Sequence, residues 1–376
     1  MREDVVIERS TRMSRLTGLA AIVGVLVLAA GPMLWNDGVL RMMLEFFYLL
    51  ALAQMWNLLA GYAGLVSIGQ QAYIGIGAYA LFAFTNVLGG NVFLGVLVAG
   101  VAAFVLAFPT AALVFRLRGG YFAIGTWVVA EVYRLVLSSQ TKLGGGSGAT
   151  VTVIGIDPTF RLFVTYWISL AIGVGSIVLV FYVLRSRLGL GLRAVRDREG
   201  AAATSGVNVR RTKVQVYVIA STVCGLAGGV IYLALLRLQP AATFSINWTV
   251  FMIFAVVIGG LGTITGPIVG TLVYFALQQY LADLGSVYLI ILGAVAIVVM
   301  LKAPNGLWGL VIDRWSVPFF PIQLRVRRTA TRPPPEVSGL VGEGLAPGFL
   351  WIDSSPPPTL GNASPACTTW RMTTSR

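Results

Sequence analysis

The sequence predicts an all-α polytopic membrane protein with about ten transmembrane helices, some of them broken or re-entrant. Hydrophobic residues make up 57% of the 376 residues and charged residues only 11%, whereas a soluble domain carries about a quarter charged residues. The mean hydropathy is +0.84. The formal net charge of +13 falls in short clusters between apolar runs, as in membrane proteins. A nucleic-acid partner would require one basic face, so we expect membrane lipid and no nucleic acid around this chain.

The first apolar run covers residues 16–35 and follows Arg9, Arg12 and Arg15. About 20 apolar residues are enough to cross roughly 30 Å of hydrocarbon. No clear small-residue cleavage site follows the run, as a signal peptide would require. We therefore predict a first membrane helix, with residues 1–15 as a cytoplasmic N-terminus.

Charge sets the orientation of the remaining spans, because positive residues stay in the cytoplasm. The loop 185–213 holds eight Arg or Lys and two acidic residues, and it is the strongest cytoplasmic marker. The Gly-rich loop 139–161 is nearly neutral and is expected outside. A cytoplasmic C-terminus then requires the glycine-broken stretch 249–282 to cross the membrane twice. The first crossing, at about 249–261, is short for a full span, so a half-helix or re-entrant segment is the alternative there. The predicted spans after the first are 42–60, 72–89, 93–115, 121–138, 162–184, 214–235, about 249–261, about 267–282 and 286–301.

These limits divide the chain into three parts. Residues 16–312 form the transmembrane domain, which includes the cytoplasmic loop 185–213. Residues 313–376 form a cytoplasmic C-terminal segment that is rich in Pro, Ser, Thr and Gly. Such a composition cannot build a core, so we expect this segment to be disordered from about residue 325.

Several kinds of chemistry are excluded by composition. The chain has no His and only two Cys, in positions that build no disulfide framework or metal site. It has no GxxxxGK[ST] phosphate loop. We therefore expect no catalytic residue, no metal site and no cofactor in this chain.

Two glycine-broken segments follow one pattern. Gly, Gly and a hydroxyl residue recur at a three-residue spacing in each, and each segment precedes a new apolar span. Paired broken helices in a transporter indicate the substrate path; the alternative is that the glycines only allow close helix packing. The two triplets are Gly61, Gly64 and Ser67, and Gly259, Gly262 and Thr265. The residues predicted to line a translocation path are Gly61, Gly64, Ser67, Gln70, Glu131, Gly262, Thr263 and Thr265.

Three ionisable residues fall inside predicted spans: Glu45, Glu131 and Arg134. Charges at membrane depth usually face the bundle interior or pair with each other. Glu131 and Arg134 are three residues apart and share one helix face, which predicts an interior ion pair. Glu45 lies near the end of its span, where its side chain can extend to the membrane interface. The alternative to these structural roles is a direct role in transport.

The cytoplasmic loop contains its own helix pattern. A short helix from about 197 to 205 is predicted, because Asp197 and Glu199 favour its N-terminus and Gly206 can cap its end. Ala201 and Ala202 keep this helix thin enough to dock in a groove of a partner. The alternative is a solvated basic loop.

Taken together, residues 40–312 resemble the permease subunit of the branched-chain amino-acid ABC importer, of the LivM type. The chain departs from the family at Gln70, where members often have His, and in the Gly-rich loop 144–148. The long Pro-rich tail is also outside the family pattern. The motifs that carry the resemblance are 57–69, 75–79, 118–124 with Glu131, 192–208, 259–267 and 304–310.

The resemblance implies an assembly in the bacterial inner membrane. A second related permease (LivH type), two cytoplasmic ATPase subunits that use ATP and magnesium, and a periplasmic solute-binding protein would work with this chain to import Leu, Ile, Val or a related small solute. It also implies that the loop 192–208 is the ATPase-coupling segment. The alternatives are a urea, amide or sugar permease of the same superfamily, or an ion-coupled secondary transporter that uses Glu45 or Glu131. The coupling residues assigned on this basis are Arg196, Glu199, Ala201, Ala202, Gly206 and Asn208.

Overall fold

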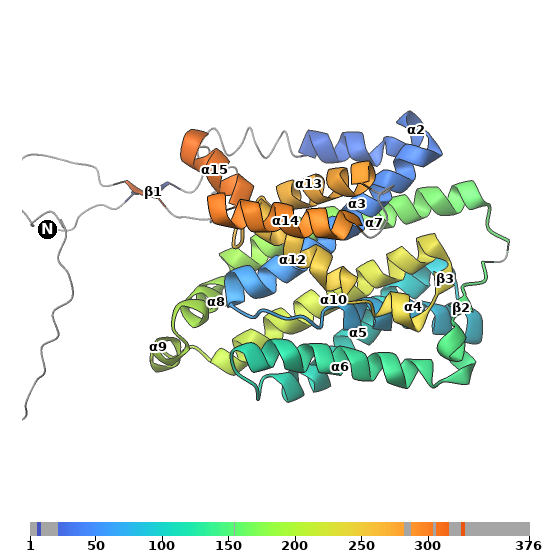
Figure 1. The fold of residues 1–376 in the computed structure, drawn as a ribbon, viewed down its shortest axis with the longest axis horizontal. Coiled ribbons are helices and arrows are strands. Elements are labelled where there is room, and N and C mark those ends of the chain that lie inside the picture. Colours follow the sequence, from blue (N-terminus) through green and yellow to red (C-terminus); the bar gives the residue numbers. More distant parts are fainter. Residues whose placement is uncertain are drawn as a thin grey trace, which may run out of the picture. The chain divides into compact units, whose positions relative to one another are not determined.

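The computed structural model describes residues 6–8, 22–153, 155–281, 287–303, 306–315 and 325–327. This part of the chain is a helical bundle with two short antiparallel strand pairs (Figure 1). Residues 22–29 are helical. The labelled α-helices are α2 (Gly31–Leu34), α3 (Asp37–Asn57), α4 (Gln71–Phe82), α5 (Val92–Val114), α6 (Gly120–Ser138), α7 (Pro158–Arg185), α8 (Arg187–Asp197), α9 (Glu199–Thr204), α10 (Val209–Leu235), α11 (Pro240–Thr243), α12 (Asn247–Gly259), α13 (Gly266–Leu281), α14 (Val287–Lys302) and α15 (Gly306–Trp315). Two π-helical turns, η1 (Leu58–Tyr62) and η2 (Ala83–Val87), continue α3 and α4, and η3 (Thr141–Leu143) and η4 (Gly145–Ser147) are 3₁₀ turns. The strands are β1 (Val6–Glu8), β2 (Ala149–Thr150), β3 (Arg237–Leu238) and β4 (Arg325–Arg327).

Polar residues begin the long helices where the sequence changes from polar to apolar. The Asn36 side chain accepts a hydrogen bond from the backbone nitrogen of Val39 at 3.0 Å and starts α3. Asp157 caps α7 in the same way, and Asn208 caps α10. Such caps satisfy backbone N–H groups that have no partner within the helix. They fix where α3, α7 and α10 begin.

Seven helices among the described residues are long and apolar enough to cross a membrane. The predicted total of ten is therefore not confirmed. The predicted span 72–89 is divided between the 12 residues of α4 and the five of η2, and 267–282 corresponds to α13, with 16 residues. The predicted short span 249–261 is longer than expected, because α11 extends it to Pro240–Gly259. The seven helices are Asp37–Tyr62, Val92–Val114, Gly120–Ser138, Pro158–Arg185, Val209–Leu235, Pro240–Gly259 and Ile290–Leu310.

The core lies around α3, α4 and α10. In their most apolar windows, 78% of α3 with η1 and 72% of α10 are buried, compared with 17% of α6. Glycines bring α4 and α10 into backbone contact: a Cβ atom on Gly77 would lie 2.1 Å from the carbonyl oxygen of Gly225. Small residues at helix interfaces allow this close approach in membranes. α6 instead lies at the edge of the bundle, beside α5 (Figure 1).

The strand pairs connect distant loops. β1 pairs with β4, with Val6 opposite Arg327, so the segment before the first described helix lies beside the segment after α15. Residues 325–327, predicted as the start of a disordered tail, instead form this strand; the tail from residue 328 lies outside the described residues. β2 pairs with β3, which joins the loop after α6 to the end of α10.

Candidate translocation and coupling site

The two glycine-broken segments meet inside the bundle. The first break is the non-helical stretch 64–70 between η1 and α4, and the second is 260–265 between α12 and α13. A Cβ atom on Gly61 would lie 2.7 Å from the backbone nitrogen of Gly262, so the chain segments at the two breaks are in direct contact. Gly64 and Gly262 have φ angles of +68° and +77°, a conformation that favours glycine. The structure therefore brings Gly61 and Gly262, and with them the two predicted segments, to one place.

Two polar side chains of α3 hold the second break. The Asn57 side-chain nitrogen donates to the carbonyl oxygen of Thr263 at 2.8 Å, and its oxygen accepts from the backbone nitrogen of Gly262 at 2.9 Å. The Gln54 nitrogen donates to the carbonyl oxygen of Ile264 at 2.8 Å. Lipid cannot satisfy such backbone groups, so buried side chains must do so. Gln54 and Asn57 are not among the residues predicted to line the path, although two polar residues three apart in an apolar span indicate such a role.

The predicted residues of the first break form a local network. Ser67 and Gln70 are fully buried. The Ser67 hydroxyl accepts from the Gln70 side-chain nitrogen and from the Gly69 backbone nitrogen, both at 3.3 Å. The backbone of Ile68 donates to the Thr126 hydroxyl at 3.1 Å, which connects this break to α6. These contacts fix the break, and the Gln70 side-chain oxygen is left without a hydrogen-bond partner among the described residues.

The predicted residues of the second break shape its turn. The Thr263 hydroxyl donates to the carbonyl oxygen of Gly260 at 3.0 Å and accepts from the backbone nitrogen of Gly266 at 2.9 Å. The carbonyl oxygen of Thr265 accepts from two backbone nitrogens of the first turn of α13, both at 3.1 Å. Thr263 and Thr265 therefore end one helix and begin the next.

Glu131 lies elsewhere, on α6. Its carboxylate accepts two hydrogen bonds from the Arg134 Nε atom, each at 2.9 Å, and also forms an ion pair with the Arg134 Nη2 atom. The predicted pair is present, but it is not inside this chain: the side chains of Glu131 and Arg134 are 45% and 29% exposed. Glu45 forms a different contact, accepting a hydrogen bond from the Gln278 side chain at 3.3 Å.

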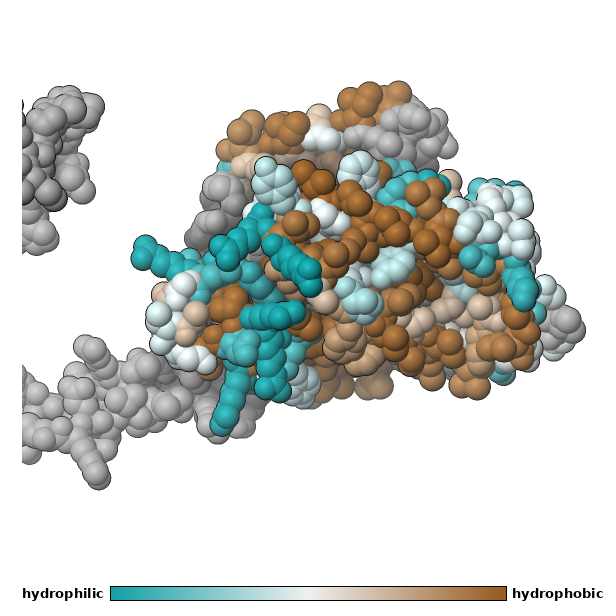
Figure 2. Space-filling model, turned by 90° about the horizontal axis from the view of Figure 1, so that it is seen from below, coloured by the Kyte–Doolittle hydropathy of each residue, from teal (hydrophilic) through white to brown (hydrophobic). Residues whose placement is uncertain are grey.

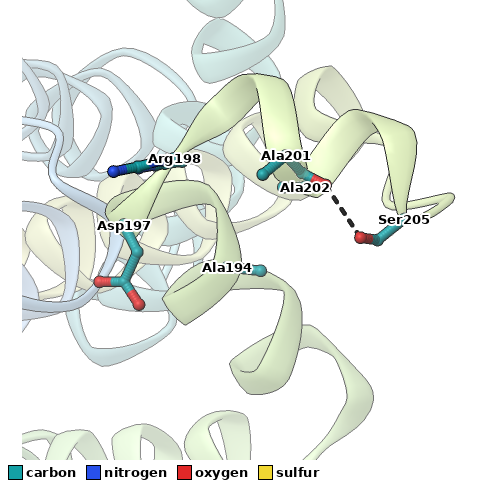
Figure 3. A pocket seen from close by; sticks show the side chains of 6 residues that line it. All are labelled: Ala194, Asp197, Arg198, Ala201, Ala202 and Ser205. Carbon is teal, nitrogen blue, oxygen red and sulfur yellow. Dashed lines mark hydrogen bonds between the residues drawn. The ribbon is translucent and has the colours of Figure 1, made fainter.

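The loop that is predicted to be cytoplasmic folds into two helices with a groove between them. α8 ends at Asp197 and α9 begins at Glu199, with Arg198 extended between them (φ −156°, ψ 107°). Asp197 therefore belongs to α8 and does not start the predicted helix, which covers only Glu199–Thr204. An open cavity of about 340 Å³ lies between the helices and is lined by Ala194, Asp197, Arg198, Ala201, Ala202 and Ser205 (Figure 3). Figure 2 shows hydrophilic side chains gathered at the end of the molecule that carries α8 and α9 in Figure 1, beside a mainly hydrophobic surface.

The predicted coupling residues have different environments. Ala202 is 2% exposed, whereas Ala201 is exposed, so of these two small residues Ala201 is the one that the described chain leaves accessible to a partner. Glu199 forms an ion pair with Lys213 of α10. Gly206 has φ +83°, as predicted for a left-handed cap, and Asn208 caps α10 by accepting from the backbone nitrogen of Arg211.

Arg196 extends toward the breaks. It lies on α8, and its Nη1 atom donates to the carbonyl oxygen of Gly61. A Cβ atom on Gly262 would lie 3.2 Å from the same Nη1 atom. Arg196 therefore joins α8 to the place where the two breaks meet, a contact between residues 135 apart that sequence spacing does not indicate.

Comparisons with known proteins agree with this arrangement of a multi-pass membrane protein. The chain is 27% identical over 319 residues to the high-affinity branched-chain amino acid transport system permease protein LivM of Escherichia coli K12, covering 76% of this chain and 74% of that protein. It is 24% identical over 273 residues to a probable branched-chain amino acid transport permease protein LivM of Methanocaldococcus jannaschii, covering 62% of this chain and 78% of that protein.

A shorter match links the chain to a sugar permease. It is 30% identical over 166 residues to the ribose import permease protein RbsC of Bacillus subtilis, covering 40% of this chain and 51% of that protein. No solved structure matches the chain. The model of one protein family matches residues 38–300, a range that contains both breaks and the helices α8 and α9. The chain belongs to the family of permease components of branched-chain amino acid transport systems.

Proposed function

We propose that this chain is the membrane-spanning permease subunit of an ABC importer of the bacterial inner membrane, and that it moves leucine, isoleucine or valine into the cytoplasm. The single observation that carries the proposal is the meeting of the two breaks at Gly61 and Gly262. Broken helices present backbone groups to a solute at membrane depth. The family and its LivM members make branched-chain amino acids the first solutes to test.

Energy must come from partner subunits. The chain has no phosphate loop, so two cytoplasmic ATPase subunits would bind ATP and magnesium and bind this chain at α8 and α9. The groove between these helices, with the exposed Ala201 at its edge, offers a concave surface for a protein contact. A periplasmic binding protein would deliver the solute on the opposite side, where β2 and β3 pair. The chain itself performs no covalent chemistry in this proposal.

The exposed face of α6 is assigned to the contact with a second, LivH-type permease. Glu131 and Arg134 stand half-exposed on a helix whose most apolar window is only 17% buried. Charges that face lipid are unfavourable at membrane depth, and in known proteins they face a bundle interior or a water-filled cavity. A second permease that covers α6 would supply that environment, and Glu131 would then lie beside a path between the two subunits.

The test is reconstitution of this chain with a second permease, the two ATPases and the binding protein in vesicles. We expect uptake of labelled leucine to require ATP and magnesium on the ATPase side and to persist when an ionophore collapses ion gradients. If uptake needs an ion gradient and no ATP, the protein is not an ABC permease but a secondary transporter that uses Glu45 or Glu131. The partial similarity to a ribose permease makes ribose the informative competitor: ATP-driven uptake of ribose without leucine would keep the transporter class and reject the solute.

A further inference from the structure

We infer that Arg196 is the link through which movement of α8 and α9 reaches the two broken segments. The inference rests on the proposed function, because it assigns a route from a partner ATPase to the path. Arg196 is the residue of α8 whose side chain bonds to the first glycine-broken segment. Its role is positioning: it acts on the path through the backbone of Gly61.

The contact lies where helical hydrogen bonding is already irregular. α3 ends in the π-helical turn η1, in which hydrogen bonds span five residues rather than four. The Gly61 carbonyl belongs to this last turn, and it accepts from a guanidinium Nη1 atom. A cation at a helix C-terminus is favoured by the helix dipole, and a hydrogen bond from a charged donor is stronger than one between neutral groups. Arg196 therefore donates a hydrogen bond to η1, the π-helical turn at the end of α3.

One guanidinium group reaches both breaks. Besides its bond to Gly61, the Nη1 atom would lie 3.2 Å from a Cβ atom placed on Gly262. On Gly64, a Cβ atom would lie 3.7 Å from Arg196 Cγ and 3.8 Å from its Cα, so the stem of the side chain follows the first break. Any shift of α8 along its axis must therefore change the contacts of both breaks together.

The other end of the link faces the cytoplasm. Arg196 precedes Asp197 and Arg198, which line the groove between α8 and α9. Arg198 is extended and turns the chain sharply into α9, while Val195 of α8 is buried against the bundle. A partner that fills the groove would tilt α8 about this buried side and would pull or release the Gly61 carbonyl. The short path from groove to break, within one helix turn, is what makes Arg196 suited to this role.

The test uses the reconstituted complex with Arg196→Lys and Arg196→Gln. Lysine keeps the charge but lacks the rigid planar guanidinium whose Nη1 atom lies against both breaks. The matched control is Arg187→Gln, at the exposed start of the same helix. Pull-down of the ATPases, solute-stimulated ATP hydrolysis and leucine uptake are measured on each variant.

We expect the Arg196 variants to assemble and to hydrolyse ATP within about twofold of the unmodified complex, while uptake falls by roughly tenfold or more, as loss of a charged hydrogen bond implies. Arg187→Gln should keep both activities. The inference is overturned if uptake and hydrolysis fall in proportion, if the ATPases no longer bind, or if neither activity changes. If the unmodified complex does not take up leucine with ATP, the proposed function fails instead, so the two failures are distinguishable.

Discussion

Gly61 lies against Gly262 so closely that a Cβ atom on Gly61 would stand 2.7 Å from the Gly262 backbone nitrogen and 2.3 Å from the Asn57 side-chain oxygen. The two breaks therefore fit only because neither residue has a side chain. We expect Gly61→Ala to separate them, with a stability loss of about 1–3 kcal/mol from overpacking and loss of uptake. Thermal unfolding in detergent and vesicle uptake check this.

Gly175→Ala is the control for that change. It lies exposed on α7, and a Cβ atom there would meet nothing within 4 Å. Alanine is also the better helix former by up to about 1 kcal/mol. Gly61→Ala with the stability and uptake of Gly175→Ala would show that the breaks are not packed as described.

The two side-chain hydrogen bonds by which Asn57 holds the second break are here called the clamp. Asn57→Leu removes both of them. The change leaves the backbone nitrogen of Gly262 and the carbonyl oxygen of Thr263, both partly buried, without their partner, which destabilises the fold by about 1 kcal/mol for each group. We expect a lowered unfolding temperature and loss of uptake, whereas Asn247→Leu, at the exposed start of α12, should have little effect. Equal behaviour of the two variants would contradict the clamp.

Replacing one member of the Glu131–Arg134 pair should weaken binding of the second permease more than replacing both members. A lone charge on α6 is left uncompensated once the second permease covers it, and breaking a buried pair costs about 3–5 kcal/mol. Glu131→Gln should therefore reduce co-purification of the second permease more than the double variant Glu131→Gln with Arg134→Gln. If single and double variants co-purify alike, α6 faces lipid or water rather than a subunit.

The substitutions Ala201→Trp and Ala202→Trp should affect different properties, the first ATPase binding and the second folding stability. Ala202 is 2% exposed, so Ala202→Trp must overpack the junction of α8, α9 and α10 and lower stability. Ala201 is exposed at the groove, so Ala201→Trp should leave folding intact and block ATPase binding. Pull-down and thermal unfolding separate the two effects. Normal ATPase binding by Ala201→Trp would place the contact elsewhere, with the turn 116–120 as the next candidate.

The two ends of α7 should lie on opposite sides of the membrane. This helix has 28 residues and separates the loop at residue 150 from the helices at residue 200. Reporter fusions at about 150 and 200 should therefore give an outside and an inside response. A cytoplasmic response at 150 would contradict both the charge pattern and the crossing by α7.

Sequence patterns predicted the elements of the site better than their contacts. The glycine spacing identified both breaks, and Gly206 was placed in the left-handed conformation that it adopts. The burial of Ala202 was missed, because a six-residue helix carries too little periodicity to show which face packs. The contact of Asn57 with Gly262 and the contact of Arg196 with Gly61 were not predicted, although Arg196 was assigned to the coupling segment, since each contact joins residues more than a hundred positions apart.

The clamp between Asn57 and Gly262 also sets an order of events during synthesis. The two residues are 205 positions apart, and at roughly 5–20 residues per second the second arrives about 10 to 40 s after the first. Until then, the amides of Gln54 and Asn57 sit in a membrane-inserted helix without the partners that they bind later. In a nascent chain stalled before residue 260, these two amides would have no such partners. The two breaks therefore come together only after residues 262–264 have been synthesised, late in the assembly of the bundle.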